Sequence, residues 1–337
     1  MFVPKRYVFE RDTLDYPLGQ ELHDQLTSQN KNVIVLKSNR AVLDKLTSLE
    51  EKFHYGKETL ILSVRRSFKF MSCRPSAHYQ MPVATGCMGR CEYCYLNTQL
   101  GDKPYVRAYV NTEEILDHAK KYIDKRGKMT LFEGASTSDP LPVEPYTHGL
   151  EKSIKYFADQ DQGHFRFVTK YSNVEPLLNI DHNNHTDIRF SINTNSIIDA
   201  YEHYTSKLDL RINAAKKIGD AGYQLGFIIA PVFMYDGWRK EYQALIDQLN
   251  RTFKDYKHGK ITFEVITHRY TERAKKRIEE VFPETGLPMD KEERKFKWGQ
   301  FGYGKWIYKP EDMDEVKEFF TERLTNMDFE TELKYIV

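Results

Sequence analysis

The chain has 337 residues, of which 40% are hydrophobic and 29% charged, a composition ordinary for a globular protein with one large domain. No apolar run approaches the roughly 18 residues that a membrane helix needs, and the N-terminus has no signal-peptide core. We therefore expect a cytoplasmic protein with no membrane partner. The net charge of +1 excludes a polycation, so nucleic-acid binding would depend on a local basic patch.

Residues 1–75 are predicted to form a small N-terminal α/β region. The apolar spacing of Leu22–Leu26 is typical of a helix. The short apolar runs Val33–Leu36 and Thr59–Val64 are typical of strands.

Residues 76–284 show an alternation of short apolar runs and helical patterns. Helices are expected over 146–157, over 238–249 and from Asn111, where Glu114 completes a capping box. The apolar runs are Met81–Thr85, Thr130–Phe132, Phe165–Thr169, Ile188–Ile192, Leu225–Val232 and Ile261–Ile266. Such β–α units predict a parallel sheet covered by helices, with functional residues at the carboxyl ends of the strands. Polar residues do follow the runs, at Cys87, Ser136–Asp139, Lys170, Asn193 and His268-Arg269.

The last region, 285–337, is basic, aromatic and punctuated by glycines. Gly302 and Gly304 predict a hairpin or tight loop. The spacing of Val316, Phe319, Phe320 and Leu324 predicts a helix that packs against it.

All four cysteines lie within one short stretch, and three of them have the spacing C-x3-C-x2-C: Cys87, Cys91 and Cys94. Clustered thiols in a large cytoplasmic chain are more typical of metal ligands than of a disulfide framework. Three thiolates in one loop can hold a 4Fe–4S cluster and leave one iron open to activate a substrate. A structural zinc site needs four ligands, and Cys73 or His78 could supply the fourth, so zinc stays an alternative.

The cysteine motif resembles the signature of the radical S-adenosylmethionine superfamily. That resemblance implies a 4Fe–4S cluster on Cys87, Cys91 and Cys94, with S-adenosylmethionine chelated by the open iron and cleaved to a 5′-deoxyadenosyl radical. It also implies a partial (β/α)6 TIM-type barrel over 76–284. The N-terminal α/β extension and the C-terminal basic hairpin plus helix would be appended to it.

A closer resemblance, over about residues 58 to 310, is to the spore photoproduct lyase family. It is carried by Ala84–Leu96, Phe132-Glu133 with Thr137–Asp139, Phe165–Lys170, Arg189–Asn193, Gly226–Pro231, Thr262–Glu264, His268-Arg269 and Lys297–Gly299 with Gly302 and Gly304-Lys305. This family reverts 5-thyminyl-5,6-dihydrothymine, a thymine dimer formed by ultraviolet light in spore DNA, to two thymines. The implied partners are UV-damaged DNA and a reductant of the flavodoxin or ferredoxin type.

The resemblance also assigns expected roles to single residues. Ser138, Lys170, Ser191, Asn193 and Ala230 match positions that hold S-adenosylmethionine. A lysine at a strand end can pair with the methionine carboxylate. Tyr93 and Tyr95 match tyrosines that return the radical after repair.

The chain departs from the family at Ser136, where relatives carry the cysteine that donates a hydrogen atom to the thymine radical. An O–H bond is too strong for this transfer, so Ser136 cannot be the donor. Three explanations are open. Cys73, the one cysteine outside the cluster motif, has taken over the role; Tyr95 donates directly; or the substrate differs or the donor was removed by engineering.

A second departure lies in the basic hairpin, where Gln300-Phe301 replaces an Arg-Tyr pair. Phe301 can still fill the gap left by a flipped base. Arg294, Lys295, Lys297 and Lys305 are expected to contact phosphates, and Arg269, Gln300 and Phe301 are further expected DNA-binding residues. The alternatives to DNA repair are a family member acting on another substrate, an Fe–S electron-transfer protein and a nucleic-acid binder.

Overall fold

The computed structural model describes residues 2–37, 46–298, 302 and 304–337. The chain forms two compact units. The first comprises Met1–Gly89, Gln99–Thr169 and Asn173–Asp187, and the second Arg90–Thr98, Lys170–Ser172 and Ile188–Val337. The three-part division predicted from the sequence stays a prediction. Within the described ranges, no helix combines the length and the apolar character that crossing a bilayer requires.

One sheet of the first unit is built largely from the N-terminal region. Its strand order is β2 (Val33–Val35), β1 (Arg6–Phe9), β3 (Thr59–Ser63), β8 (Val106–Tyr109) and β6 (Ala84–Thr85). Helices α1 (Pro17–Ser28) and α2 (Leu49–Lys57) and the 3-10 turn η1 (Arg11–Asp15) connect its first strands. Leu22 and Leu26 of α1 join the core formed by Phe9, Leu60 and Leu62. The helix and the two strands predicted for this region are therefore confirmed.

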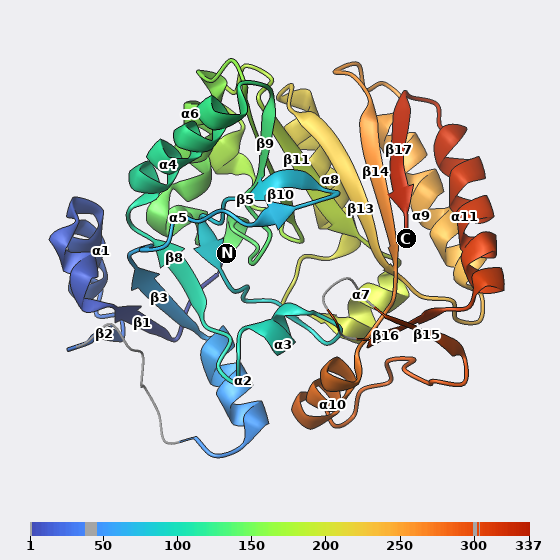
Figure 1. Cartoon of the computed structure of the whole chain (residues 1–337), viewed down its shortest axis with the longest axis horizontal. Helices are drawn as coiled ribbons and strands as arrows, with labels where there is room; N and C mark the ends of the chain where they lie inside the picture. Colours follow the sequence, from blue (N-terminus) through green and yellow to red (C-terminus); the bar gives the residue numbers. More distant parts are fainter. Residues whose placement is uncertain (1, 38–45, 299–301, 303) are drawn as a thin grey trace. The chain divides into compact units, whose positions relative to one another are not determined.

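The other strands of the first unit follow one another in the order β4 (Ser72–Cys73), β5 (Ala77–Gln80), β9 (Thr130–Glu133) and β10 (Gly163–Thr169). Strands β5, β9 and β10 run parallel. Helices α4 (Thr112–Arg126) and α6 (Gly149–Ala158) pack on β9 and β10, with α5 (Glu144–Thr147) and the turns η2 (Leu141–Val143) and η3 (Glu175–Leu177) between elements (Figure 1). The predicted parallel strands covered by helices are present here.

Three local predictions in the first unit are wrong. A strand over Met81–Thr85 does not form, because the ladder from Glu133 ends at Met81 and Pro82 has no N–H to continue it. The chain then enters β6, which pairs antiparallel with β8. The helix expected over 146–157 is split, since His148 has a left-handed backbone between α5 and α6.

The third wrong prediction is the capping box at Asn111. Helix α4 does start after this residue, but the Asn111 side chain makes no cap hydrogen bond. Its oxygen instead accepts from the Arg65 N–H at 2.8 Å, and its amide group donates to Arg65 O and to Glu114. The Asn111 side chain therefore bonds mainly to the distant Arg65 backbone and does not cap the helix as the local pattern predicted.

In the second unit the strand order is β11 (Thr186–Ile192, from Ile188 onward), β13 (Gln224–Val232), β14 (Ile261–Thr267) and β17 (Thr331–Ile336). Strand β14 lies parallel to both β13 and β17. The helices are α7 (Asn195–Tyr201), α8 (Leu208–Asp220), α9 (Trp238–Phe253), α10 (Glu272–Val281) and α11 (Pro310–Thr325), and α3 (Leu96–Gln99) begins in this unit. Figure 1 shows α9 and α11 beside β14 and β17.

Two small antiparallel ladders complete the second unit. Strand β7 (Arg90–Cys91) pairs with β12 (Glu202–His203), and β15 (Arg294–Trp298) pairs with β16 (Gly304–Tyr308). The latter ladder confirms the predicted hairpin, and α11 confirms the helix after it. Strand β17 was not predicted, because its alternating polar residues suit a sheet edge and lack the continuous apolar run of a buried strand.

Candidate active site

The loop that leads to the first cysteine is fixed by a glycine. Gly86 has φ of 79°, and a Cβ atom on it would lie 2.1 Å from Tyr105 O, so only glycine fits. Its N–H donates to Thr137 O at 2.8 Å, and it forms a β-bridge with Ser138. The start of the cysteine loop is thereby tied to the loop after β9, which carries the predicted S-adenosylmethionine contact Ser138.

Cys87 lies half-buried in the first unit in a setting that suits a thiolate ligand. The Gly89 N–H donates to Cys87 Sγ at 3.3 Å, and hydrogen bonds to sulfur are one of the means by which proteins tune iron–sulfur clusters. Lys57 Nζ donates to Cys87 O at 2.9 Å and brings a positive charge to the loop. The donor set and its surroundings fit a cluster that carries negative charge.

Cys91 and Cys94 belong to the second unit. Cys91 is buried in β7, directly opposite Glu202 of β12. A turn follows, in which the Cys94 N–H donates to Cys91 O at 3.2 Å and the Asn97 side chain donates to the same oxygen at 3.0 Å. The backbone between these two cysteines is therefore held at both ends.

The loop after β9 offers hydroxyl groups that suit a bound ligand. Ser138 is 7% exposed, and the hydroxyl groups of Ser138 and Thr137 have no hydrogen-bond partner among the residues that the structure describes. Buried hydroxyl groups are normally satisfied, so such a pair is expected where a ligand supplies the partner. Asp139, next in the chain, is held by Thr169 Oγ1 at 3.1 Å.

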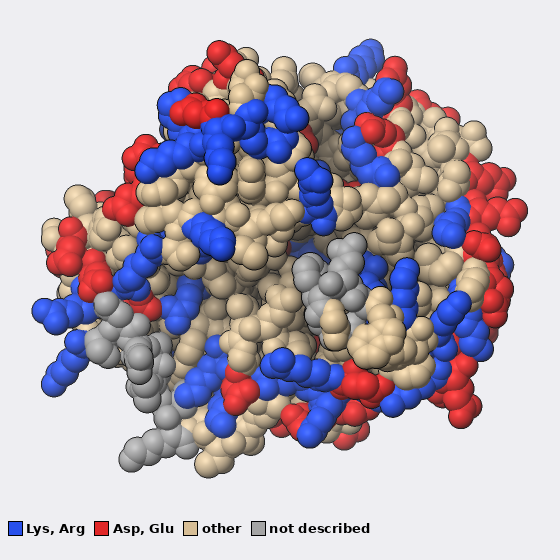
Figure 2. All heavy atoms as spheres, viewed as in Figure 1, with Lys and Arg blue, Asp and Glu red and all other residues tan. Residues whose placement is uncertain are grey.

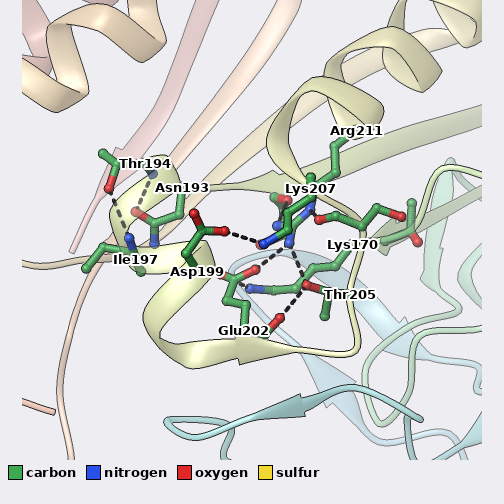
Figure 3. Close-up of polar contacts among 12 residues, drawn as sticks. Lys170, Asn193, Thr194, Ile197, Asp199, Glu202, Thr205, Lys207 and Arg211 are labelled. Atoms are coloured by element: carbon green, nitrogen blue, oxygen red, sulfur yellow. Dashed lines mark hydrogen bonds and ion pairs between the residues drawn. The ribbon is translucent and has the colours of Figure 1, made fainter. Parts of the chain in front are cut away.

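Lys170, which follows β10, is held in a network of charged groups (Figure 3). Its Nζ donates to Glu202 Oε1 at 2.5 Å. It also donates to the Tyr93 hydroxyl at 2.6 Å, and that hydroxyl donates to Glu202. The other carboxylate oxygen accepts from Arg211 Nη2 at 2.6 Å. The side chains of Glu202 and Arg211 are fully enclosed, whereas Lys170 is partly accessible.

Opposing effects act on the ionisation of this network. Burial alone would raise the pKa of the Glu202 carboxyl, but the charges of Lys170 and Arg211 outweigh it and lower that pKa to about 2. Burial, followed by the charge of Glu202, raises the pKa of the Tyr93 hydroxyl well above its ordinary value. A neutral Tyr93 and an ionised Glu202 follow at neutral pH.

The remaining predicted cofactor residues lie on β11 and β13 or directly after β11. Ser191 is buried, and its carbonyl oxygen accepts from Arg211 Nη1 at 2.9 Å. Asn193 is fully buried; its amide donates to Pro231 O at 2.7 Å, and its oxygen accepts from the Tyr242 hydroxyl at 2.8 Å. Asn193 thus supports the segment that follows Ala230, which is itself half-buried.

Cys73, Ser136 and Tyr95 are the residues on which the hydrogen-donor question depends. Cys73 is half-buried in β4, and the turn after it is tied to β10, since Arg166 Nη1 donates to Ser76 O at 2.8 Å. Arg166 also lies 3.5 Å from the carboxylate of Glu133, the last residue of β9. The half-buried Ser136 follows three residues later, whereas Tyr95, in the second unit, is 54% exposed.

His78, the alternative zinc ligand, has a structural partner. Its Nδ1 accepts from the Leu131 N–H at 2.9 Å. Because Nδ1 accepts this hydrogen bond, the proton of the neutral ring is on Nε2, so in this arrangement neither nitrogen offers a free lone pair to a zinc ion.

The β15–β16 hairpin carries lysines that have no ion-pair partner among the described residues, although the Glu272 carboxylate accepts a hydrogen bond from Trp306 of β16. Lys297 lies directly opposite Lys305, and Lys295 and Arg269 are exposed. Burial, then the charges of Arg269 and Lys297, lower the pKa of the Lys305 ammonium. Figure 2 shows basic and acidic side chains interspersed on the face in view, so this face does not carry charge of a single sign.

One cationic residue of the hairpin, Arg294, is not exposed. Arg294 was expected to contact phosphate, and this is wrong: it is buried, donates to His268 O and Pro288 O, and stacks on the Tyr308 ring. Gln300 and Phe301 lie outside the described residues. Trp298, which sequence reasoning did not single out, is 70% exposed beside Lys297.

Comparisons with known proteins identify the family. A family model described as spore photoproduct lyase matches residues 2–337. The chain is 46% identical to a spore photoproduct lyase of Clostridium acetobutylicum, over 99% of this chain and 98% of that protein. It is 44% identical to one from Bacillus subtilis, over 94% of this chain and 93% of that protein.

The chain belongs to the spore photoproduct lyase family.

A solved structure of a spore photoproduct lyase agrees with this assignment. It is a cysteine-to-alanine, serine-to-cysteine double mutant with bound AdoMet and dinucleoside spore photoproduct. Its TM-score is 0.95 at 42% identity, with 100% of this chain and 99% of that chain covered. The predicted fold class, an α/β partial barrel, and the predicted enzyme class, a radical S-adenosylmethionine lyase, are thereby confirmed. Membership in the spore photoproduct lyase family also implies the two predicted cofactors, a 4Fe–4S cluster and S-adenosylmethionine.

Glu202 and Arg211 are the site residues that the sequence did not reveal. Neither belongs to the stretches that carry the resemblance to spore photoproduct lyases, and each occurs in an ordinary polar context in the chain. Their importance comes from burial and from partners far away in sequence, as the contact between Tyr93 and Glu202 illustrates.

Proposed function

We propose that this protein reverts the spore photoproduct in UV-damaged DNA to two thymines, in the cytoplasm, with electrons from a flavodoxin or ferredoxin. The observation that carries the proposal is the Cys87, Cys91 and Cys94 loop joined at Gly86 to the Ser138 loop, in a chain of this family. When bound, the cluster and S-adenosylmethionine supply the 5′-deoxyadenosyl radical. The three cysteines would hold the cluster.

The proposal gives the protein's own residues binding roles around S-adenosylmethionine. Lys170 offers an ammonium to the methionine carboxylate, and Ser138 offers a buried hydroxyl. Ser191 and Ala230 contribute from β11 and β13, while Asn193 keeps the segment after Ala230 in place. Polar groups on the carboxyl side of parallel strands are where such folds bind ligands.

Cys73 is proposed as the hydrogen donor. Its S–H bond would break as a C–H bond forms on the thymine allylic radical, which leaves a thiyl radical on Cys73. The Arg166 contacts to Ser76 and Glu133 tie the turn after Cys73 to the strand that leads to Ser136, which supports the proposal that the Cys73 thiol takes the role of the one absent at Ser136. Tyr93 and Tyr95 would then return a hydrogen atom to the sulfur and pass the radical on.

DNA binding is assigned to the hairpin and its neighbour. Arg269, Lys295, Lys297 and Lys305 would contact phosphates, and the family resemblance adds Gln300 and Phe301 to the proposed DNA-binding residues. We also propose that the chain divides into 1–75, 76–284 and 285–337, and that the basic hairpin of the last part binds DNA.

Anaerobic incubation of the reconstituted protein with a dinucleotide carrying the lesion, S-adenosylmethionine and dithionite tests the proposal. We expect release of thymidylyl-thymidine, and no release from a Cys91→Ala control. An intact cluster without release would contradict the proposed substrate. Formation of 5′-deoxyadenosine uncoupled from repair would then favour another substrate, which the Ser136 departure makes the second candidate.

A further inference from the structure

Glu202 connects parts of the site that lie far apart in the sequence (Figure 3). One carboxylate oxygen accepts from Lys170 and the other from Arg211. The first oxygen also accepts from the Tyr93 hydroxyl. In the β7–β12 ladder the backbone of Glu202 lies opposite Cys91, a proposed cluster ligand. A single enclosed residue therefore contacts the strand of a cluster ligand and the lysine proposed to bind S-adenosylmethionine.

Arg211 extends these connections from helix α8. Its Nη1 donates to Ser191 O at 2.9 Å and its Nε donates to Ser206 O at 2.7 Å. The Ser206 N–H in turn donates to Lys170 O at 3.1 Å. Arg211 thus fixes the backbone at Ser191 and, through Ser206, the backbone at Lys170.

The charges of this group suit an anionic ligand. Lys170 and Arg211 carry two positive charges and Glu202 one negative charge, which leaves one net positive charge at the partly accessible Lys170. A lysine has a flexible stem and a point charge, so a fixed carboxylate is needed to hold its ammonium in one place. Arg211 offers a rigid fork that holds the carboxylate itself.

We propose that Glu202 and Arg211 are a positioning pair that sets Lys170 and Ser191 for the methionine end of S-adenosylmethionine. The pair acts through Lys170 and Ser191 and does not itself touch the cofactor. This inference rests on the proposed function, because it presumes that Lys170 binds S-adenosylmethionine.

Titration of the reduced, reconstituted protein with S-adenosylmethionine, followed by EPR of the cluster, tests the pair. In Glu202→Gln the amide must turn its NH2 group toward a donor, either Arg211 or the Lys170 and Tyr93 side, so both sides cannot be satisfied. We expect the half-saturating concentration to rise about tenfold, with iron and sulfide content and the spectrum without S-adenosylmethionine unchanged. Asp199→Asn, which removes an exposed carboxylate bonded to Lys207 in the same segment, should stay within twofold of wild type.

A double-mutant cycle separates positioning from general damage. If Glu202 acts largely through Lys170, then Glu202→Gln should weaken binding clearly less in a Lys170→Ala background than in the wild type, with the remainder due to Ser191. Additive effects, or a Glu202→Gln variant within twofold of wild type, would overturn the proposal.

If Glu202→Gln loses its cluster, a second variant, Glu202→Asp, tests the proposal. Glu202→Asp keeps the charge but shortens the side chain, so we expect it to restore the iron content while S-adenosylmethionine binding stays weak. Wild-type affinity in this variant, or loss of the cluster in both, would also overturn the proposal. If instead the wild-type spectrum does not respond to S-adenosylmethionine, the proposed function has failed and not the positioning role.

Discussion

Lys297 and Lys305 lie directly opposite each other across the β15–β16 ladder. Like charges at facing positions of a sheet are destabilising unless something compensates them. Among the residues that the structure describes, neither ammonium has an acidic partner. In the proposed complex, a phosphate group of the bound DNA would compensate these two charges.

The first prediction concerns this lysine pair. We expect Lys305→Gln to weaken binding of damaged and undamaged DNA to a similar extent, because phosphate contacts are independent of sequence. The slope of log affinity against log salt concentration should fall by about 1. Fluorescence anisotropy at several salt concentrations measures both quantities. Lys317→Gln, in an exposed pair with Asp314 on α11, is the control; an equal effect there would remove the hairpin's special role.

The second prediction concerns Gly86. Gly86→Ala should lower the iron content after reconstitution and the melting temperature, because its Cβ would collide with Tyr105 O and the backbone is left-handed. Gly101→Ala has a similar φ of 75°, but its Cβ would meet nothing within 4 Å, so it should cost only about 1–2 kcal/mol. Equal losses in the two variants would mean that the contact with Tyr105 is unimportant.

The third prediction concerns pH and His268. This imidazole is 3% exposed and stacks on the Phe233 ring at 4.5 Å, and burial, helped by the charge of Arg294, lowers its pKa from 6.5 to about 3. Below pH 6.5 the unfolded chain gains a proton that the folded chain does not, so stability is lost as the pH falls toward 3. Between pH 7.5 and 5.5 the expected loss from this group is about 1.4 kcal/mol.

Anaerobic urea unfolding of wild type and His268→Phe across this pH range measures the effect. The variant keeps a ring against Phe233 and removes the titrating group, so its stability should depend less on pH. Parallel curves for the two proteins would show that His268 is not the group responsible.

The fourth prediction concerns the hydrogen donor. Cys73→Ala should still consume the lesion but divert the thymine radical to side adducts, with at least a tenfold loss of thymidylyl-thymidine, because no thiol is left to repair the radical. Product analysis by mass spectrometry distinguishes these species. Cys73→Ala combined with Ser136→Cys should recover the normal product. Clean repair by Cys73→Ala alone would show that Cys73 is not the hydrogen donor.

The features that could be predicted from the sequence were local patterns. The runs at Phe165–Thr169 and Leu225–Val232 became β10 and β13, because buried parallel strands need continuous apolar side chains. The C-x3-C-x2-C loop could be found because its three cysteines are close together in the sequence. Lys170 could be found because it directly follows a predicted strand, where ligand-binding residues of such folds lie. Family resemblance then supplied roles that no periodicity contains.

The features that could not be predicted depend on distant partners. Pro82 interrupts a run whose hydrophobicity suits a strand, and Asn111 exchanges a helix cap for contacts with Arg65. Glu202 and Arg211 resemble surface residues in the chain, yet both are buried because each neutralises the other. Glu202 and Arg211 are nine residues apart and lie on two different elements, so the local sequence around each does not reveal that they pair.

The enclosed pair of Glu202 and Arg211 also constrains how related sequences can diverge. Loss of Glu202 would leave the buried charge of Arg211 uncompensated, at a cost of about 3–5 kcal/mol, and loss of Arg211 would leave the buried Glu202 carboxylate with the partly accessible Lys170 as its charged partner. Replacement of both by well-packed apolar side chains avoids that cost but gives up the hold on Lys170. Active relatives should therefore keep positions 202 and 211 together, and lineages that have lost one should be those that have lost the activity.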